Sequence, residues 1–453
     1  MKNLLYTRFW RLHFFAALFI TPLLLSLTLS GIGYLFFTDV ENQLYDDYFF
    51  GKSNKEEVLT IDEAVEKAEA AFAGYSTNKV IVLEEPYNTR LTLSNGKDEK
   101  YIFLDDNNQM VGSQDAQYTF SNIMRSIHSS LFIGGTFVNY LVELAACWTI
   151  FLLLSGLYMT FKGNLLKKRK LENKRQKNKR WHALVGTIIT IPMVIFIFTG
   201  LLWSAFLGSV LSDIASESPT FGYPLLQQQP PTSDVSEIPW ATRQLEAPVS
   251  DGEHARHHGG GVERYTNPNQ VTIAGLLKEI KVQNIEKPYT ILYPSNDEGV
   301  FTVAKASNSG VTGLDVNPSD EATMYFDQYS GKLIDQVNYE DYGMLAKFFT
   351  WGIPLHEGHL FGWPNKLLNL VVCLAFLAVI MWGIRTWILR KKKGELSAPP
   401  QISYKISLPF IIFLIILGVL MPLFGASLIA VVLIEYIILG WQAKRKLRTE
   451  APK

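Results

Sequence analysis

Four long apolar stretches constrain the fold of this chain more strongly than any other feature of its sequence. A helix that crosses the hydrocarbon core of a bilayer, which is about 30 Å thick, needs roughly 20 apolar residues. A fifth apolar block is too long for one ordinary span and is interrupted by Pro409, Pro422 and Gly425. We therefore predict an α-helical integral membrane protein with four membrane helices and a C-terminal pair of short helices. The four stretches comprise residues 12–37, 137–161, 182–208 and 366–389, and the fifth block comprises residues 406–441.

Clusters of lysine and arginine predict the orientation of these helices, because such clusters accumulate in short cytoplasmic loops. With six helices counted, all four clusters fall on one side, so we expect both termini in the cytoplasm and residues 38–136 and 209–365 outside. The first apolar stretch has no small-residue cleavage site, so we interpret it as a retained anchor. The clusters are Lys2 with Arg8 and Arg11, residues 162–180, residues 390–393 and residues 444–448.

Composition and missing motifs exclude several functions. The 42 basic residues balance 42 acidic residues, so no global charge indicates a nucleic-acid partner. The sequence has no G-x-G-x-x-G after a strand, no P-loop and no C-x-x-C-H, so Rossmann dinucleotide binding, nucleotide hydrolysis and covalent c-type haem are unsupported. Cys147 and Cys373 fall inside predicted membrane helices, where we expect them to contribute to packing.

Both outer segments show the pattern of a small α+β module. In the first, TIDEAVEKAEAAF at residues 60–72 has apolar residues at helical spacing and precedes segments that alternate like strands. The second repeats this order from TIAGLLKEI at residues 272–280 onward. A stretch rich in Pro, Gln, Ser and His, residues 216–265, is expected to be a linker. The predicted domains are an anchor helix (1–37), a first outer module (38–136), two membrane helices with a basic loop (137–208), a second outer module with its linker (209–365), a fourth membrane helix (366–393) and the C-terminal helix pair with a basic tail (394–453).

One helix-module-helix unit occurs twice in the chain. The first and third apolar stretches each begin with a His beside basic residues and contain a Pro near the middle. The approach to the second membrane helix, IHSSLFIGG, resembles the approach to the fourth, LHEGHLFGW. This alignment pairs His13 with His182 and, allowing a shift of one residue, His128 with His356. His359 has no counterpart in the first repeat.

These motifs resemble the PepSY-associated transmembrane family of bacterial iron-regulated membrane proteins. The resemblance rests on the R-x-H start of the first helix, IHSSLFIG before the second, RWHALVG in the third and H-x-G-x-x-F-G before the fourth, and it extends to about residue 390. It implies two extracytoplasmic PepSY-like modules, a multi-pass protein of the bacterial cytoplasmic (inner) membrane and a link to iron uptake. Some relatives resemble b-type haem siderophore reductases.

The paired histidines fit two b-type haem sites at opposite depths. In the predicted orientation, His13 and His182 lie at the cytoplasmic ends of their helices, whereas His128 and His356 lie near the outer surface. A b-type haem needs two axial imidazoles from facing elements in an apolar cavity, which a helical bundle supplies. We therefore expect a four-helix haem-binding bundle in which His13 and His182 ligate an inner haem b, and His128 and His356 ligate an outer one.

Simpler roles remain open for these residues and their neighbours. A histidine at a membrane interface can lie among lipid headgroups, although ionisable residues in membrane helices are usually functional. Arg125 is a candidate partner of a haem propionate, and His359 is the alternative outer ligand. The glycines at 31, 156, 200 and 383 could admit a porphyrin or serve helix packing. His254, His257 and His258 could bind a transition metal or form a solvated loop.

The favoured function is electron transfer through two haems to a ferric siderophore or other ferric chelate on the outer face of the membrane, for iron acquisition. The donor would be a quinol or a cytoplasmic reductant. The alternatives are a siderophore or metal permease component and a PepSY-based regulatory or binding protein without redox activity. A permease predicts polar residues near mid-membrane, and Glu143 is the one carboxylate within the four long apolar stretches. A zinc protease is disfavoured because His356 and His359 are three residues apart rather than four.

Overall fold

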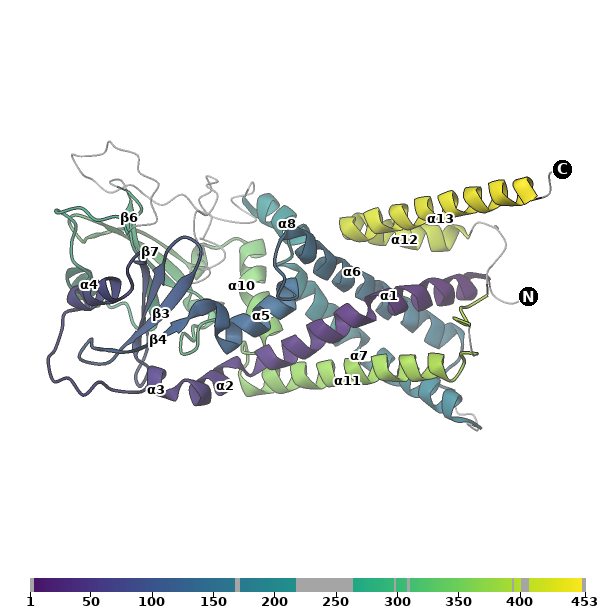
Figure 1. The fold of residues 1–453 in the computed structure, drawn as a ribbon, viewed down its shortest axis with the longest axis horizontal. Coiled ribbons are helices and arrows are strands. Elements are labelled where there is room, and N and C mark those ends of the chain that lie inside the picture. Colours follow the sequence, from purple (N-terminus) through teal and green to yellow (C-terminus); the bar gives the residue numbers. More distant parts are fainter. Residues whose placement is uncertain are drawn as a thin grey trace. The chain divides into compact units, whose positions relative to one another are not determined.

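The computed structural model describes residues 4–167, 172–216, 264–296, 299–307, 310–392, 395–400 and 407–449. The chain divides into two compact units. Their segments can be followed by the sequence colours of Figure 1. The helical unit comprises Met1–Leu29, Ile127–Val210 and Leu368–Lys453, and the sheet unit comprises Ser30–Ser126 and Leu211–Leu367. Most of the predicted linker, residues 217–263, lies outside the described residues, and so do His254, His257 and His258.

Four described helices are long and apolar enough to cross a membrane, which confirms the number predicted from hydropathy. They run alongside one another in Figure 1 and are α1 (Leu4–Leu35), α6 (Thr136–Lys162), α7 (Lys174–Leu201) and α11 (Trp363–Ile388). α7 begins eight residues before the predicted stretch because the Asn173 side chain caps it, accepting a hydrogen bond from the Gln176 N–H at 2.9 Å. A polar cap therefore sets this boundary, and hydropathy does not detect it.

The predicted stretch 182–208 is not one helix. α7 ends at Leu201, and a separate helix, α8 (Leu207–Ser216), follows. Both carboxylate oxygens of Glu143 accept hydrogen bonds at the start of α8, from the backbone N–H groups of Phe206 at 2.8 Å and Leu207 at 3.0 Å. The first N–H groups of a helix have no partner within the helix, and a carboxylate satisfies them well. Glu143 thus has a structural role that requires no transported ion.

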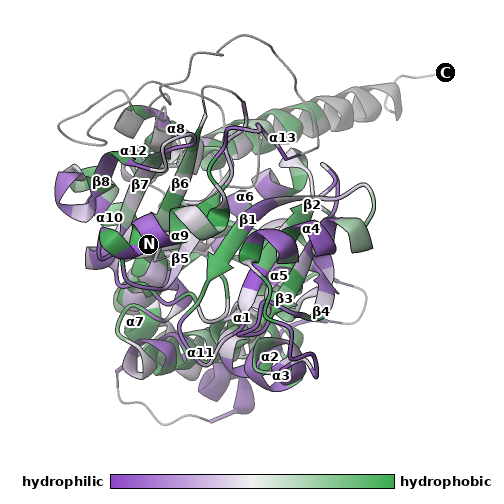
Figure 2. Cartoon of the chain, turned by 90° about the vertical axis from the view of Figure 1, so that its left-hand side faces the viewer, coloured by the Kyte–Doolittle hydropathy of each residue, from purple (hydrophilic) through white to green (hydrophobic). Residues whose placement is uncertain are grey.

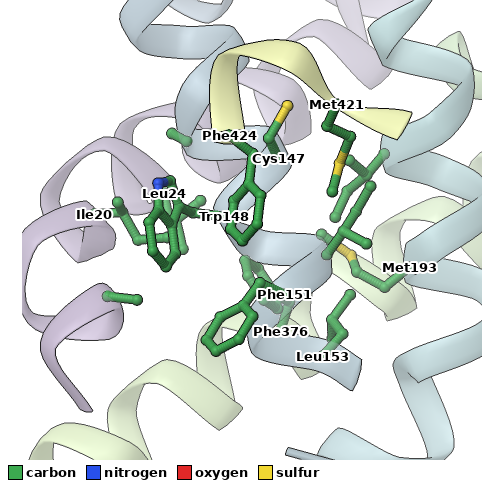
Figure 3. Packing of buried hydrophobic residues seen from close by; sticks show 14 of the residues in the cluster. Ile20, Leu24, Cys147, Trp148, Phe151, Leu153, Met193, Phe376, Met421 and Phe424 are labelled. Atoms are coloured by element: carbon green, nitrogen blue, oxygen red, sulfur yellow. The ribbon is translucent and has the colours of Figure 1, made fainter. Parts of the chain in front are cut away.

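An aromatic core holds the helical unit together (Figure 3). Trp148 and Phe151 of α6 pack against Phe424, with ring centroids 4.7 Å apart for Trp148 and 6.0 Å apart for Phe151. The Trp148 indole N–H donates to the Ser427 hydroxyl at 3.1 Å. Cys147 is free and buried in this core, and Cys373 of α11 is free and buried as well, as packing residues would be.

The C-terminal pair of helices is present, but only the first is short. α12 (Leu408–Leu420) rises about 20 Å, which is less than the hydrocarbon thickness. α13 (Pro422–Thr449) is longer than predicted because the basic tail continues the helix beyond its apolar part. A Cβ atom on Gly425 would lie 2.9 Å from the carbonyl oxygen of Gly418, so the close crossing of α12 and α13 requires glycine at that point.

The described residues of the sheet unit form one antiparallel sheet of eight strands in the order β4-β3-β2-β1-β5-β6-β7-β8. Each predicted module contributes one half, and β1 pairs with β5 in the centre, with Val80 opposite Ile291. The repeated element order was predicted, whereas the joining of both modules into one sheet was not. The first half comprises β1 (Ser76–Val82), β2 (Thr89–Ser94), β3 (Glu99–Leu104) and β4 (Met110–Asp115), and the second half comprises β5 (Tyr289–Leu292), β6 (Val300–Lys305), β7 (Ala322–Asp327) and β8 (Leu333–Asn338).

Two equivalent helices, α4 (Ile61–Ala71) and α9 (Ile273–Val282), cover one face of this sheet (Figure 2). Both begin at a threonine N-cap, and Thr60 forms a full capping box with Glu63. Asp62 joins the two repeats, because its carboxylate accepts hydrogen bonds from the N–H groups of Ile273 at 2.7 Å and Ala274 at 2.9 Å. On the other face, Phe49 of α3 (Asp46–Phe49) packs against the β3 aromatics. α2 (Phe37–Leu44) precedes α3.

Each half of the sheet ends in a short helix that leads to a membrane helix. In the first repeat, η1 (Ala116–Tyr118) precedes α5 (Phe120–Ser130), and α6 follows. In the second, η2 (Pro318–Asp320) lies before β7, η3 (Tyr339–Asp341) precedes α10 (Met344–Glu357), and α11 follows. His128 and His356 occupy the last turns of α5 and α10. The structure therefore supports the predicted duplication and the correspondence of these two histidines.

Candidate functional site

His13 of α1 and His182 of α7 lie close together inside the helical unit. Their ring centroids are 6.4 Å apart and their planes are inclined at 82°. An iron held between two imidazole nitrogens, with bonds of about 2 Å each, separates the ring centres by roughly 6 Å. The two side chains come from equivalent helices of the two repeats, as the sequence predicted. Their spacing fits the inner haem pair.

Hydrogen bonds orient both imidazoles, and they fix the tautomer of His182. Nδ1 of His182 lies 2.9 Å from the carbonyl oxygen of Val379, which can only accept, so Nδ1 carries the proton. Nδ1 of His13 lies 2.8 Å from the Ser155 hydroxyl, which itself donates to the carbonyl of Leu152 at 3.2 Å. With its proton directed at Leu152, the Ser155 oxygen accepts a hydrogen bond from Nδ1 of His13. In this arrangement Nε2 of both residues keeps its lone pair, as an iron ligand must. Nδ1 donates a hydrogen bond to the protein, as the second ring nitrogen of a metal-binding histidine commonly does.

Glycine lies against each imidazole at equivalent points of the repeats. A Cβ atom on Gly156 of α6 would lie 3.5 Å from Cε1 of His13. A Cβ atom on Gly383 of α11 would lie 3.3 Å from Cε1 of His182 and 3.4 Å from its Nδ1. Two of the four glycines singled out in the sequence thus bring the helix backbone close to an imidazole.

His128 has the same tautomer as the inner pair. Its Nδ1 lies 2.9 Å from the carbonyl oxygen of Leu27, so this nitrogen donates and Nε2 keeps the lone pair. Burial lowers the pKa of His128, while the bond to Leu27 raises it. His128 belongs to the helical unit, whereas His356 belongs to the sheet unit. Their pairing in an outer site therefore remains a prediction from the sequence.

His356 and His359 differ in their local structure. Gly358 adopts a left-handed conformation with φ of 87° and ends α10 directly after Glu357, so His359 lies beyond the helix. The two histidines do not share one helical face, as the zinc-protease motif requires. Nε2 of His359 lies 3.1 Å from the carbonyl oxygen of Ser307 and must carry the proton. His359 therefore lacks the tautomer that His13, His128 and His182 share.

Arg125 lies in the sheet unit beside a buried carboxylate, Glu357. Its Nη2 donates to Oδ1 of Asn122 at 2.7 Å, and its side chain is exposed. The Tyr34 hydroxyl bonds to the Glu357 carboxylate, and Nε2 of His359 lies 3.7 Å from Oε2 of that group. Burial raises the pKa of Glu357, and the positive charges beside it act in the opposite direction. Arg125, the predicted partner of a haem propionate, thus also lies beside the Glu357 carboxylate and offsets its negative charge.

Sequence reasoning missed the residues that orient the imidazoles. Ser155 is completely buried, and its position directly before Gly156 in the apolar run was the only available signal. Val379 acts through its backbone, which no side-chain pattern reveals. Glu357 was visible between the two histidines, but its burial was not. Across the described ranges, no three or more His, Cys, Asp or Glu side chains form a metal-binding group.

Comparison with known proteins identifies one family. The PepSY-associated TM region matches residues 10–390, from α1 to the end of α11, and leaves α12 and α13 outside the match. No curated protein matches the sequence.

Proposed function

The chain belongs to the PepSY-associated TM region family, and on this premise we propose that it carries electrons outward across the cytoplasmic membrane to ferric siderophores or other ferric chelates. His13 and His182 would hold an inner haem b, and His128 and His356 an outer one. Membrane helices and a PepSY-like sheet unit are consistent with an iron-regulated membrane protein of this kind.

The observation that carries the proposal is the inner imidazole pair. Two histidines from different helices lie at a separation that suits one iron atom, and each keeps an Nε2 lone pair. The printed hydrogen bonds engage Nδ1 of each ring, so each Nε2 is left as an acceptor that an iron ion could use. Ser155 and the Val379 carbonyl orient the rings before any cofactor binds, which reduces the ordering cost of binding.

When bound, the haems supply one-electron carriers, and reduction of Fe(III) to Fe(II) weakens its bonds to the hard oxygen ligands of siderophores. The residues bind and orient; none is required as a general acid or base. A quinol donor would release two electrons and two protons on the cytoplasmic side, enough to reduce two ferric ions. A cytoplasmic one-electron reductant would serve equally.

The chelate would dock on exposed aromatic side chains of the sheet unit. Trp351, Phe361 and Trp363 are 39%, 61% and 64% exposed. The Trp351 indole donates to the Tyr339 hydroxyl at 2.8 Å, and Trp363 lies against Phe36 with ring centroids 6.4 Å apart. Both rings are thereby held in place while their faces remain accessible to an aromatic or hydroxamate-bearing ligand.

Anaerobic reduction of the purified protein followed by addition of ferric siderophores tests this function. We expect the haem to be reoxidised while an equivalent amount of Fe(II) is captured by a ferrous chelator. The His182→Ala variant should lose electron transfer from an added quinol. A haem that stays reduced against hydroxamate, catecholate and citrate chelates would contradict the proposal.

The permease alternative is weakened by Glu143, whose carboxylate is fully used at the start of α8. A binding protein without redox activity remains as the second candidate, because the sheet unit alone could engage a partner. An absorption spectrum separates the two, since only the electron carrier requires haem.

A further inference from the structure

A cluster of basic and aromatic side chains lies at the basic end of the helical unit. The guanidinium group of Arg390, just beyond α11, lies over two rings of α1, at 5.3 Å from the Trp10 centroid and 5.0 Å from the Phe14 centroid. Arg175 and Lys179 of α7 are within electrostatic range of Arg390. We call these five residues the Arg390 cluster.

Among the described residues, the positive charges of the cluster have no ion-pair partner of opposite sign. Nε of Arg390 is buried and has no hydrogen-bond partner, and no carboxylate pairs with this side chain in the part of the chain that the structure describes. Burial lowers the pKa of Arg390, and Arg175 lowers it further. Segments 168–171, 393–394 and 401–406, which lie outside the described residues, contain no Asp or Glu in their sequence. A buried, unpaired guanidinium donor is costly unless an acceptor is supplied.

The helix faces that carry the Arg390 cluster are those that carry the imidazole pair. On α7, Arg175, Lys179 and His182 follow one another at spacings of four and three residues, so they share one face. On α1, His13 lies between Trp10 and Phe14. Since a helix rises 1.5 Å per residue, the cluster extends about 5 to 10 Å along the helices from His182.

We propose that the Arg390 cluster binds an anionic oxygen group, a carboxylate or a phosphate. Arg390 would donate through Nε and a terminal nitrogen, a fork that matches the two oxygens of either group. Trp10 and Phe14 hold the guanidinium plane from the α1 side. Two sources have this chemistry: the propionate of a haem held by His13 and His182, which rests on the proposed function, and the phosphate of an anionic lipid in the inner leaflet.

Two variants and a matched control test the site. Arg390→Gln removes the charge, whereas Arg390→Lys keeps the charge and removes the fork. Lys391→Gln makes the same charge change at the next position, on an exposed side chain over Trp387. Size-exclusion chromatography and circular dichroism establish that each variant is folded. If Arg390→Gln fails to fold, Arg390→Lys carries the test.

The first arm measures binding of haem b and of its dimethyl ester, in which both propionates are esterified, to protein produced without haem. If a propionate occupies the site, wild-type protein and Lys391→Gln should bind haem at least about tenfold more tightly than the ester, and Arg390→Gln should lose that preference. Any contribution of an outer haem is the same in both variants and cancels.

The second arm needs no haem and measures the melting temperature in nanodiscs of phosphatidylcholine with or without phosphatidylglycerol. If a lipid phosphate occupies the site, phosphatidylglycerol should stabilise wild-type protein and Lys391→Gln but not Arg390→Gln. If phosphatidylglycerol stabilises the protein in this way and the protein never binds haem, the anion site is supported and the proposed function is contradicted. If the protein binds haem but Arg390→Gln changes neither the preference for haem over its ester nor the stabilisation by phosphatidylglycerol, the proposed function stands and the anion site is contradicted.

Discussion

Gly383 meets the imidazole of His182 so closely that a Cβ atom on it would lie 3.3 Å from Cε1. The equivalent contact in the other repeat joins Gly156 to His13 at 3.5 Å. The distance at Gly383 is tighter than most Cβ contacts, whereas the distance at Gly156 is an ordinary van der Waals contact. Glycine at position 383 therefore lets His182 occupy the position that it has in the inner pair.

Gly383→Ala should displace the His182 ring and weaken haem binding. Overpacking of this kind costs about 1 to 3 kcal/mol, which is roughly a 5- to 150-fold loss of affinity. The haem-to-protein ratio and a haem titration measure it. Gly186→Ala is the matched control, because its Cβ would lie at an ordinary 4.0 Å from Val379. Equal haem affinity in the two variants would count against the role of Gly383.

Ser155→Ala should weaken the inner site by removing the acceptor of the His13 Nδ1 proton. Loss of such an orienting partner typically costs about 10- to 100-fold in metal affinity. The reduction potential of the inner haem should also rise, because Nδ1–H no longer donates and the imidazole becomes a weaker electron donor. Ser155→Thr keeps the hydroxyl and should restore both values. A potential that is identical in Ser155→Ala and wild-type protein would refute this role.

His356→Ala should remove the outer haem and leave the spectrum of the inner one. His359→Ala should leave both, because Nε2 of His359 is committed to the Ser307 carbonyl. Haem stoichiometry from a pyridine haemochrome assay distinguishes the two variants. If His359→Ala loses a haem and His356→Ala does not, the assignment of the outer ligand is wrong.

Glu143→Ala should destabilise the helical unit without affecting haem binding. The change leaves the N–H groups of Phe206 and Leu207 without their acceptor in a site where Glu143 is 2% exposed. An unsatisfied buried donor costs about 1 to 3 kcal/mol, so the melting temperature in detergent should fall. A variant with unchanged stability and impaired siderophore uptake would instead favour the permease.

A periplasm-active phosphatase fused after residue 240 should be active in cells. The position follows the third membrane helix, which the basic clusters orient with its far end outside. A fusion after residue 170, in the basic loop, provides the inactive control. Activity of the second fusion and not of the first would reverse the predicted topology.

The sequence predicted which helices and strands are present. It predicted less well where they begin and end, and it did not predict that the two modules share one sheet. Hydropathy located α1, α6, α7 and α11 because membrane spans need long apolar runs, but the Asn173 cap and the break after Leu201 are polar, local features. The second module was visible from its repeated pattern. Its pairing with the first module through β1 and β5 was not visible, since this pairing depends on contacts between residues far apart in the chain.

For the candidate site as well, the sequence predicted the histidines but not the partners that orient them. His13 and His182 were paired by the duplication, and the structure brings them together. The hydrogen bonds that orient their rings involve Ser155 and a backbone carbonyl, which depend on how α1 packs against α6 and how α7 packs against α11. Such partners become visible only when the helices are placed in three dimensions.

The absorption spectrum of purified protein, expressed with ample haem, tests the proposed electron carrier most directly. We predict a Soret band and, after reduction, the α-band of low-spin b-type haem, with the same component lost in His13→Ala and in His182→Ala. Wild-type protein that is folded but shows no Soret band under these conditions would contradict the proposal.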